Sequence, residues 1–191
     1  MAEPRPLFIP VILGTVRKGR RSAFAAQIVL EHVRARAGVE TELIDIATLG
    51  LAVDDEGVRT KTAAFSEKMA RADALVVVTP EYNRGYPGSL KHALDSCLEE
   101  YVHKAVGIVG VSAGPWGGTR VIEGLLPVMR ELGLVTIFWD VNFTHAFKIF
   151  DAEGKLLDPA YGPRIEKFLS ELVWMATTLR HGRESVALER P

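Results

Sequence analysis

Residues 10–29 read PVILGTVRKGRRSAFAAQIV: an apolar run that ends at Gly14, a basic loop, and an alanine-rich segment with helical spacing. A strand–loop–helix junction of this kind commonly binds phosphate, because the N–H groups and the dipole at the helix start both point at the ligand. Gly14 and Gly19 have the spacing of a P-loop, but Arg20 and Arg21 stand where Lys and Ser or Thr belong. The dinucleotide pattern G-x-G-x-x-G is also missing. The stretch therefore predicts an anion-binding junction and leaves the identity of the anion open.

The same order, an apolar run followed by a helical pattern, repeats along the chain. Five apolar runs suit buried strands, namely Leu7–Leu13, Glu40–Ile46, Ala74–Thr79, Ala105–Val111 and Leu134–Trp139. Apolar residues have helical spacing at 26–37, 65–72, 90–101, 122–132 and 163–179, and Pro127 is expected to kink the fourth of these helices. Regular β–α alternation predicts a parallel sheet with helices on both faces, and five units are too few for an eight-stranded barrel. We expect one doubly wound α/β domain over residues 1–191.

Composition and charge restrict the classes of partner. The formal net charge is −1, so the chain lacks the basic excess of a nucleic-acid-binding protein. No apolar run is long enough to span a bilayer, and residues 1–10 lack the pattern of a secretory signal. The single cysteine, Cys97, rules out an internal disulfide and shares a helical stripe with Leu90 and Leu94, which favours a buried structural thiol over a nucleophile. We expect a cytoplasmic protein with neither a nucleic-acid nor a membrane partner.

Ligands of doubly wound sheets bind beyond the carboxyl ends of the strands, where the strand order reverses. The loops in that position read GTVRKGRRS (14–22), PEYNRGYPGS (80–89) and SAGPWGGT (112–119). The first offers the hydroxyls of Thr15 and Ser22 and the guanidinium groups of Arg17 and Arg21, a donor set that suits a phosphate monoester. Two plainer interpretations stay open: Ser22 as a helix N-cap, and the arginines as a solvated turn. The acidic loop at 49–60 is expected to lie away from an anionic ligand.

The other two loops carry features that suit a flat ring. Pro80–Asn83 directly follow the third strand, where an extended backbone would bond to the edge of a heterocycle and Tyr82 would wall one side. A core position for Tyr82 is the alternative, although a strand end is an unusual place to bury it. In the last loop Gly114, Gly117 and Gly118 either let the backbone pass close to a ring or simply form the turn. A phosphate loop beside a ring platform describes a mononucleotide with a planar head.

On these three loops the sequence resembles the NAD(P)H-dependent FMN reductases of flavodoxin-like fold, a family that includes quinone, azo-dye and chromate reductases. The resemblance covers nearly all of the chain, and PEYNRGYPGSLKHALD (80–95) is its strongest motif. It implies a three-layer sandwich with a five-stranded parallel sheet in the order 2-1-3-4-5. The residues that it implies at FMN are Thr15, Arg17 and Ser22 at the phosphate, Pro80, Glu81, Tyr82 and Asn83 framing the ring, and Ser112, Gly114, Gly117 and Gly118 bordering it. Gly14 and Arg21, in the same loop as the phosphate residues, are also expected to bind the cofactor. The first loop has an extra residue between Arg17 and Ser22, so a contact of Arg21 with the phosphate stays open.

The resemblance implies an enzyme that passes electrons from NADPH or NADH through FMN to a flavin, a quinone or a similar small acceptor in a ping-pong cycle. The flavin carries the chemistry, so no catalytic side chain is expected. The five histidines lack metal-ligand spacing, so no metal site is expected either. Two other classes stay open. A flavodoxin-like electron carrier is disfavoured by the near-neutral charge, and a nucleoside-phosphate-binding domain by the missing P-loop Lys and hydroxyl.

Residues 136–150, TIFWDVNFTHAFKIF, predict a contact between subunits. The segment carries Phe138, Trp139, Phe143, Phe147 and Phe150, more aromatic surface than one strand and its loop readily bury. Tyr101 is expected to join the same surface. We expect a homodimer or homotetramer, which the resemblance also implies. The alternative is that these rings pack beneath the final helix.

Overall fold

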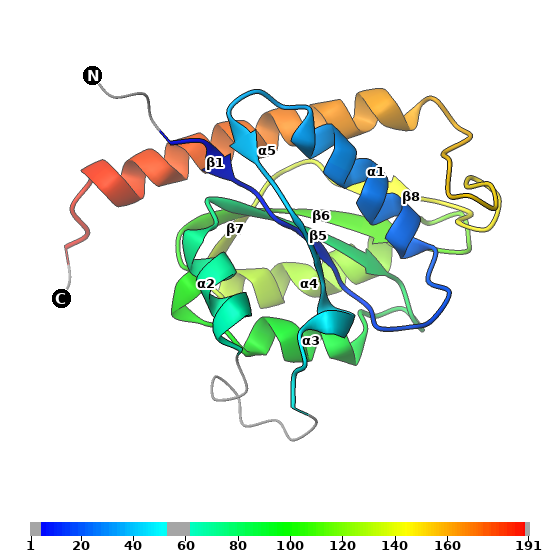
Figure 1. Cartoon of the computed structure of the whole chain (residues 1–191), viewed down its shortest axis with the longest axis horizontal. Coiled ribbons are helices and arrows are strands. Elements are labelled where there is room, and N and C mark those ends of the chain that lie inside the picture. The colour runs from blue at the N-terminus through cyan, green and yellow to red at the C-terminus, as the bar shows by residue number, and fades with distance from the viewer. Residues whose placement is uncertain (1–4, 53–61, 190–191) are drawn as a thin grey trace.

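The protein is a parallel sheet between two layers of helices (Figure 1). The computed structural model describes residues 5–52 and 62–189. One face of the sheet is covered by α1 (Ser22–Arg34) and α5 (Tyr161–Ser185). The opposite face is covered by α2 (Ala63–Arg71), α3 (Gly88–Asp95) and α4 (Thr119–Glu131). The predicted three-layer α/β architecture is confirmed.

Within the described residues, the main sheet has six strands in the order β4-β2-β5-β6-β7, with β8 as a further partner of β6, and every pairing is parallel. These strands are β2 (Val11–Leu13), β4 (Leu43–Asp45), β5 (Ala74–Pro80), β6 (Lys104–Val111), β7 (Leu134–Thr136) and β8 (Val141–Phe143). A separate parallel pair, β1 (Leu7–Phe8) and β3 (Val39–Glu40), precedes β2 and β4 in the chain. The path through the sheet follows the predicted order 2-1-3-4-5, whereas the predicted count of five strands is too low.

Two predicted strands are divided and a third is shortened, and two of these departures have an identifiable cause. Pro10 lies between β1 and β2, and it has no N–H group to donate to a neighbouring strand. The second predicted strand is interrupted opposite Pro10, between Glu40 of β3 and Leu43 of β4. The predicted strand 134–139 ends at Thr136, and beyond it the N–H groups of Phe138 and Trp139 donate to the Glu171 carboxylate on α5 (3.1 and 3.3 Å). The chain then returns to the sheet as β8.

The helices also depart from the predicted limits. α3 ends at Asp95, and the end of the predicted helix 90–101 forms a separate 3-10 turn at Glu99–Tyr101. α4 runs through Pro127 to its end at Glu131. A second 3-10 turn, Ile46–Thr48, follows β4 and is capped by the Asp45 side chain. In the described ranges, no helix combines the length and the apolar character that crossing a membrane requires.

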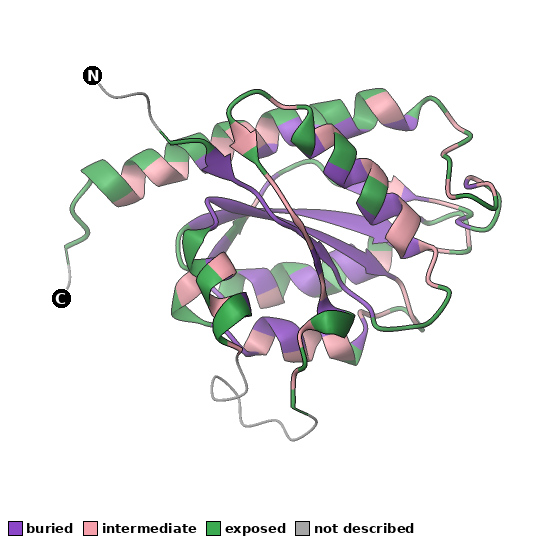
Figure 2. Cartoon of the chain, in the orientation of Figure 1, coloured by how far each residue is buried: buried purple, intermediate pink, exposed green. Residues whose placement is uncertain are grey.

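The central strands are buried on both faces, as expected for a parallel sheet between helices (Figure 2). In β5, Val76 and Val78 pack on the side of α1 and α5, while Leu75 and Val77 pack on the side of α2, α3 and α4. Cys97 belongs to the second of these cores and is fully buried, as predicted for a structural thiol. The two cores hold the strands rigidly and leave the loops at their ends to form a site.

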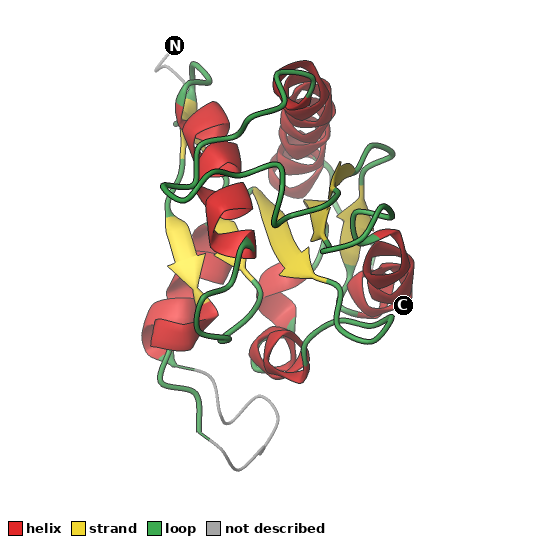
Figure 3. Cartoon of the chain, turned by 90° about the vertical axis from the view of Figure 1, so that its right-hand side faces the viewer, coloured by secondary structure: helices red, strands yellow, loops and turns green. Residues whose placement is uncertain are grey.

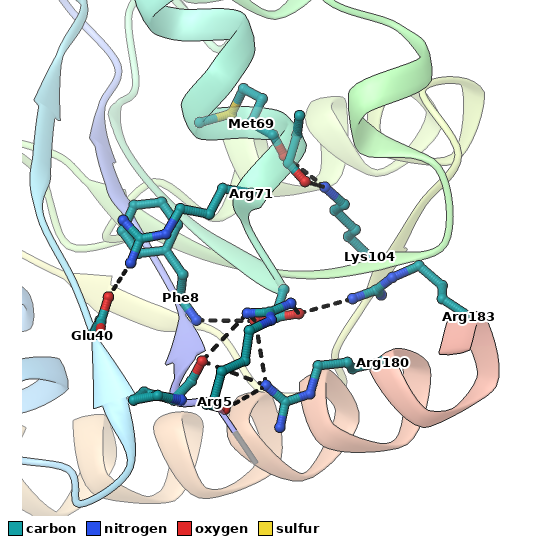
Figure 4. Close-up of polar contacts among 11 residues, drawn as sticks. Arg5, Phe8, Glu40, Met69, Arg71, Lys104, Arg180 and Arg183 are labelled. Carbon is teal, nitrogen blue, oxygen red and sulfur yellow. Dashed lines mark hydrogen bonds and ion pairs between the residues drawn. The ribbon is translucent and has the colours of Figure 1, made fainter. Parts of the chain in front are cut away.

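A buried ionic cluster lies at the beginning of β5 and β6, away from the loops that follow these strands (Figure 4). The Asp73 carboxylate is fully buried and accepts two hydrogen bonds from Arg5 (2.8 and 2.9 Å) and one from Arg183 (3.0 Å). Lys104 donates to two carbonyl groups near the end of α2 (2.6 and 2.7 Å), and burial lowers the pKa of Lys104 to about 8. The cluster fastens the N-terminal segment and the second half of α5 to the sheet.

Candidate functional site

A cavity of about 180 Å³ lies where the basic loop after β2 meets the segments that follow β5, β6 and β8. Figure 3 faces the loops on this side of the sheet. Seven of the residues predicted for a binding site line it, namely Arg17, Arg21, Ser22, Pro80, Glu81, Tyr82 and Ser112. Doubly wound sheets bind ligands in crevices at the strand ends. The predicted convergence of the three loops is therefore present in the structure.

Ser22 gives the basic part of the cavity a buried hydroxyl. It is the first residue of α1 and is 2% exposed, and its Oγ has no hydrogen-bond partner among the described residues. Arg21 takes the N-cap position without a side-chain capping bond, so the N-cap interpretation of Ser22 is wrong. Because buried polar groups are nearly always paired, this hydroxyl points to a ligand group beside it. The positive end of the α1 dipole favours an anion at the same place.

Three arginines of the basic loop line the cavity, and each has a partner within the protein. The Arg17 guanidinium stacks on the Tyr82 ring, with Cζ 3.6 Å from the ring centroid. Arg20, which the sequence analysis did not assign to the site, forms an ion pair with Asp45. Arg21 donates to a backbone carbonyl oxygen in the segment after β8 (3.0 Å). These contacts orient the guanidinium groups, while residues 16–19 are exposed, as in the solvated-turn interpretation.

Tyr82 is positioned by a tight turn and by a contact of its hydroxyl. The backbones of Tyr82 and Gly85 exchange hydrogen bonds of 2.9 and 3.0 Å, and Asn83 and Arg84 between them have φ values of 50° and 68°, as in a type I′ turn. The Tyr82 hydroxyl lies 3.1 Å from Oγ1 of Thr15, which is buried. Tyr82 is partly buried and lines the cavity, so the core interpretation is wrong, while the turn leaves Asn83 exposed.

Glu81 brings a carboxylate to the cavity. Its backbone N–H donates to the carbonyl oxygen of Val111 (2.9 Å), which fixes the residue against the end of β6. Oε1 accepts a hydrogen bond of 3.4 Å from Nη1 of Arg120. Oε2 is buried and has no partner among the described residues. Oε2 of Glu81 is thus one of three buried polar atoms of lining residues that lack a hydrogen-bond partner among the described residues, with Nε of Arg20 and Oγ of Ser22.

The glycines after β6 shape the turn rather than the cavity wall. Gly118 is the N-cap of α4 with φ 83°, and an added Cβ there would lie 2.8 Å from Cα of Gly110. An added Cβ at Gly117 would lie 2.7 Å from a side-chain atom of β8. These close approaches favour the turn-forming interpretation of both glycines. The predicted site residues outside the cavity lining are Gly14, Thr15, Asn83, Gly114, Gly117 and Gly118, and their contact with a cofactor stays a prediction.

The part of the cavity wall that follows β8 was not predicted from the sequence. Phe147, which is 67% exposed, and the buried Ala146 line the cavity there, and the Phe147 ring lies 5.6 Å from Cζ of Arg21. The other unpredicted lining residues are Gly19, Arg20, Val111 and Ala113. The sequence identifies Phe147 only as one of several aromatic residues. The rule that ligands bind where the strand order reverses does not point to the loop after the last strand.

Two rings of the expected subunit contact are instead in the core. Phe143 and Phe150 are buried, and the Phe143 ring stacks on Tyr161 of α5 with centroids 4.6 Å apart. Tyr101 is also fully buried, so its expected place on that surface is wrong. For Phe143 and Phe150 the alternative of packing with the final helix is correct, because β8 returns to the sheet and directs them inward.

The lining suits a ligand that carries an anionic group and also hydroxyl or N–H donors. The basic loop supplies cationic donors and the Ser22 hydroxyl, and Glu81 supplies an acceptor. In residues 5–52 and 62–189, no group of three or more His, Cys, Asp or Glu side chains is placed to hold a metal ion. The acidic loop at 49–60 falls mostly outside the described residues.

Comparisons with known proteins identify the family of the chain. A family model described as NADPH-dependent FMN reductase matches residues 8–148. The chain is 31% identical to an NAD(P)H-dependent FMN reductase of Pseudomonas aeruginosa over 88% of this chain and 95% of the relative. It is 28% identical to a quinone reductase of Pseudomonas putida over 85% of this chain and 92% of the relative. The solved structure of a flavoenzyme NAD(P)H:(acceptor) oxidoreductase from Paracoccus denitrificans superposes with a TM-score of 0.75 at 21% identity, covering 90% of this chain and 98% of that one.

Proposed function

The chain belongs to the NADPH-dependent FMN reductase family, and from this premise we propose that the cavity at the strand ends is its flavin site. The protein is a flavodoxin-like oxidoreductase that uses FMN and takes electrons from NAD(P)H. It is therefore an enzyme rather than an electron carrier. The observation that supports the placement of the cofactor best is the buried Ser22 hydroxyl, which lacks a partner among the described residues and lies in a basic loop at the start of α1.

The lining fits the phosphate of FMN. A phosphate monoester accepts many hydrogen bonds, and it would satisfy the Ser22 hydroxyl while lying at the positive end of the α1 dipole. Arg17 and Arg21 line the same cavity and would add charge-assisted contacts. We assign the phosphate to these three residues.

The flavin ring is proposed to lie toward the mouth of the cavity. A volume of about 180 Å³ is below the roughly 300 Å³ at the lower end of small-molecule sites, so only part of FMN fits inside. Tyr82 and Phe147 are the aromatic residues of the lining, and both suit contact with a flat ring system. A ring at the mouth is open to a nicotinamide or to an acceptor.

When bound, FMN supplies the redox chemistry, a hydride taken from NAD(P)H and electrons passed on to an acceptor. The residues of this chain bind and orient it: the basic loop holds the phosphate, and the Tyr82 turn defines where the ring lies. We propose that donor and acceptor use the same exposed ring in turn, which makes the cycle ping-pong. Quinones are proposed acceptors because relatives from Pseudomonas putida and Burkholderia are named for quinone reduction, and free flavins because the Pseudomonas aeruginosa relative is named an FMN reductase.

Steady-state kinetics of the FMN-reconstituted protein test this proposal. NADPH or NADH is varied at several fixed concentrations of a benzoquinone. Parallel lines in reciprocal plots are expected for the ping-pong order, and intersecting lines would reject it. Failure of the protein to bind FMN would reject the proposed site itself.

We also propose that the working form is a homodimer or homotetramer, now with a corrected contact surface. Phe138 is 77% exposed and its ring lies 4.8 Å from that of Trp139. The N–H groups of both residues bond to Glu171 on α5, one helical turn before Trp174, which is 62% exposed. These three rings, Phe138, Trp139 and Trp174, form the patch that we assign to the subunit contact.

A further inference from the structure

Arg120 brings a positive charge to the edge of the cavity, and most of its hydrogen-bonding capacity is unused. It lies in the first turn of α4, which contains no acidic residue, and its side chain is 40% exposed. Among the described residues its only hydrogen-bond partner is Oε1 of Glu81, a residue of the cavity lining, at 3.4 Å from Nη1. A guanidinium has several N–H donors, and charge-assisted hydrogen bonds are commonly about 2.7–2.9 Å long. The pair is therefore weak, and the guanidinium can bind a further anion.

Trp116 places a flat apolar ring beside this charge. The indole is 61% exposed, and Cζ of Arg120 lies 5.4 Å from the ring centroid, within the range of a cation–π contact. The carbonyl oxygen of Trp116 accepts hydrogen bonds from the N–H group (3.0 Å) and from Oγ1 (2.7 Å) of Thr119. These bonds fix the backbone at the start of α4 and leave the ring in solvent. A positioned, exposed aromatic ring is a surface on which a second flat ring stacks.

The exposed charge at this edge of the cavity is positive. Glu81 is 11% exposed and its Oε2 is buried, whereas Arg120 is 40% exposed. A ligand that approaches from solvent therefore meets the guanidinium before the carboxylate. A neutral flat ligand would gain only the stacking on Trp116, while a ligand with an anionic oxygen would also gain a charge-assisted hydrogen bond.

We propose that Trp116 and Arg120 select electron acceptors that combine a flat ring with an anionic oxygen, such as ionised hydroxyquinones. Trp116 stacks on the ring of the acceptor, and Arg120 binds its anionic oxygen. The inference rests on the quinone reduction proposed above, in which NAD(P)H is oxidised to NAD(P)⁺ while the quinone gains a hydride equivalent and one solvent proton to become the hydroquinone. Both residues determine specificity, and neither is required to transfer electrons.

The first test measures kcat/KM of the FMN-loaded protein for lawsone, a hydroxynaphthoquinone that is an anion at neutral pH, and for menadione, a neutral methylnaphthoquinone of similar size. Each quinone is compared with itself across variants, because the two differ in reduction potential. Arg120→Gln is expected to lower kcat/KM for lawsone about five- to tenfold, the range for a solvent-screened charged contact, and Arg120→Lys to restore part of the loss. Menadione should be unaffected by both changes, whereas Trp116→Ala should lower kcat/KM for both quinones. Arg130→Gln, an exposed arginine near the end of the same helix, is the matched control.

The second test does not depend on turnover. Naphthoate is a flat anion that takes no electrons, and naphthamide is its neutral counterpart. Each is titrated into the FMN-loaded protein, and its dissociation constant is obtained from the change in flavin absorbance. Arg120→Gln should weaken the binding of naphthoate and leave that of naphthamide unchanged. The FMN dissociation constant and the melting temperature should stay at their wild-type values, because Gln keeps an N–H donor for Glu81.

Three results would overturn the inference. One is a change of less than about twofold for lawsone in Arg120→Gln, and another is an equal loss for lawsone and menadione. The third is a loss of FMN affinity or a lower melting temperature in Arg120→Gln, which would make Arg120 a structural partner of Glu81. A wild-type protein that binds no FMN, or that reduces neither quinone, would instead refute the proposed function, so the two failures are distinguishable.

Discussion

Replacing Ser22 with Ala removes one oxygen atom and distinguishes its contribution to cofactor affinity from its contribution to folding stability. In the cofactor-free protein the hydroxyl is buried and has no hydrogen-bond partner among the described residues, so its removal breaks no bond there. Folding stability is therefore expected to stay the same or to rise slightly. In the complex the same hydroxyl donates to a charged phosphate, an interaction of about 1.5–3 kcal/mol. The FMN dissociation constant is expected to increase about ten- to a hundredfold.

Fluorescence titration of the apo-protein with FMN and with riboflavin measures this effect. Ser22→Ala should weaken FMN binding and leave riboflavin binding unchanged, because riboflavin has no phosphate. Ser185→Ala, at the exposed end of α5, is the control for the same chemical change far from the cavity. Equal losses for FMN and riboflavin, or no loss for either, would show that the phosphate does not lie at the start of α1.

Two other changes test the subunit contact and the titration of a partly buried carboxyl group. Phe138→Glu is expected to convert the oligomer into monomers, as measured by light scattering, with little change in the melting temperature of the subunit. Phe143→Glu should instead prevent folding, because Phe143 is in the core. An unchanged mass for Phe138→Glu would show that the patch is not part of the subunit contact. Burial and the nearby Glu123 raise the pKa of Asp140 from 3.8 to about 6. Between these values the folded state binds more protons than the unfolded state, so this group lowers stability as pH rises through the window. Asp140→Asn should therefore raise the melting temperature at pH 7 and have little effect below about pH 4, and equal shifts at both pH values would contradict this reasoning.

The sheet could be predicted because each central strand repeats one physical pattern. β5 and β6 are apolar throughout, which requires a cover on both faces, and the helical patterns between the strands provide it. The early end of the last predicted strand could not be predicted, since it depends on the Glu171 carboxylate of α5 reaching the N–H groups of Phe138 and Trp139. Contacts between segments so distant in sequence leave no local signal.

Part of the candidate site follows from local chemistry, and part depends on tertiary packing. The basic loop and the residues after β5 were identified because their donors and their position at strand ends are visible in the sequence. The place of Phe147 in the wall depends on β8 returning to the sheet beside β6. Gly117 and Gly118 have the composition of a ligand loop, but their backbones approach β8 and Gly110 so closely that a packing role explains them.

Anaerobic reduction tests the central claim most directly, namely that this chain is an FMN enzyme that takes electrons from NAD(P)H. The FMN-loaded protein is mixed with one equivalent of NADPH or NADH in the absence of oxygen, and the visible absorbance of the flavin is followed in a stopped-flow instrument. Rapid bleaching is expected, followed by recovery of the absorbance when a benzoquinone is added. Bound flavin that keeps its absorbance with both nicotinamides, while dithionite bleaches it, would contradict the claim and would indicate an electron carrier instead.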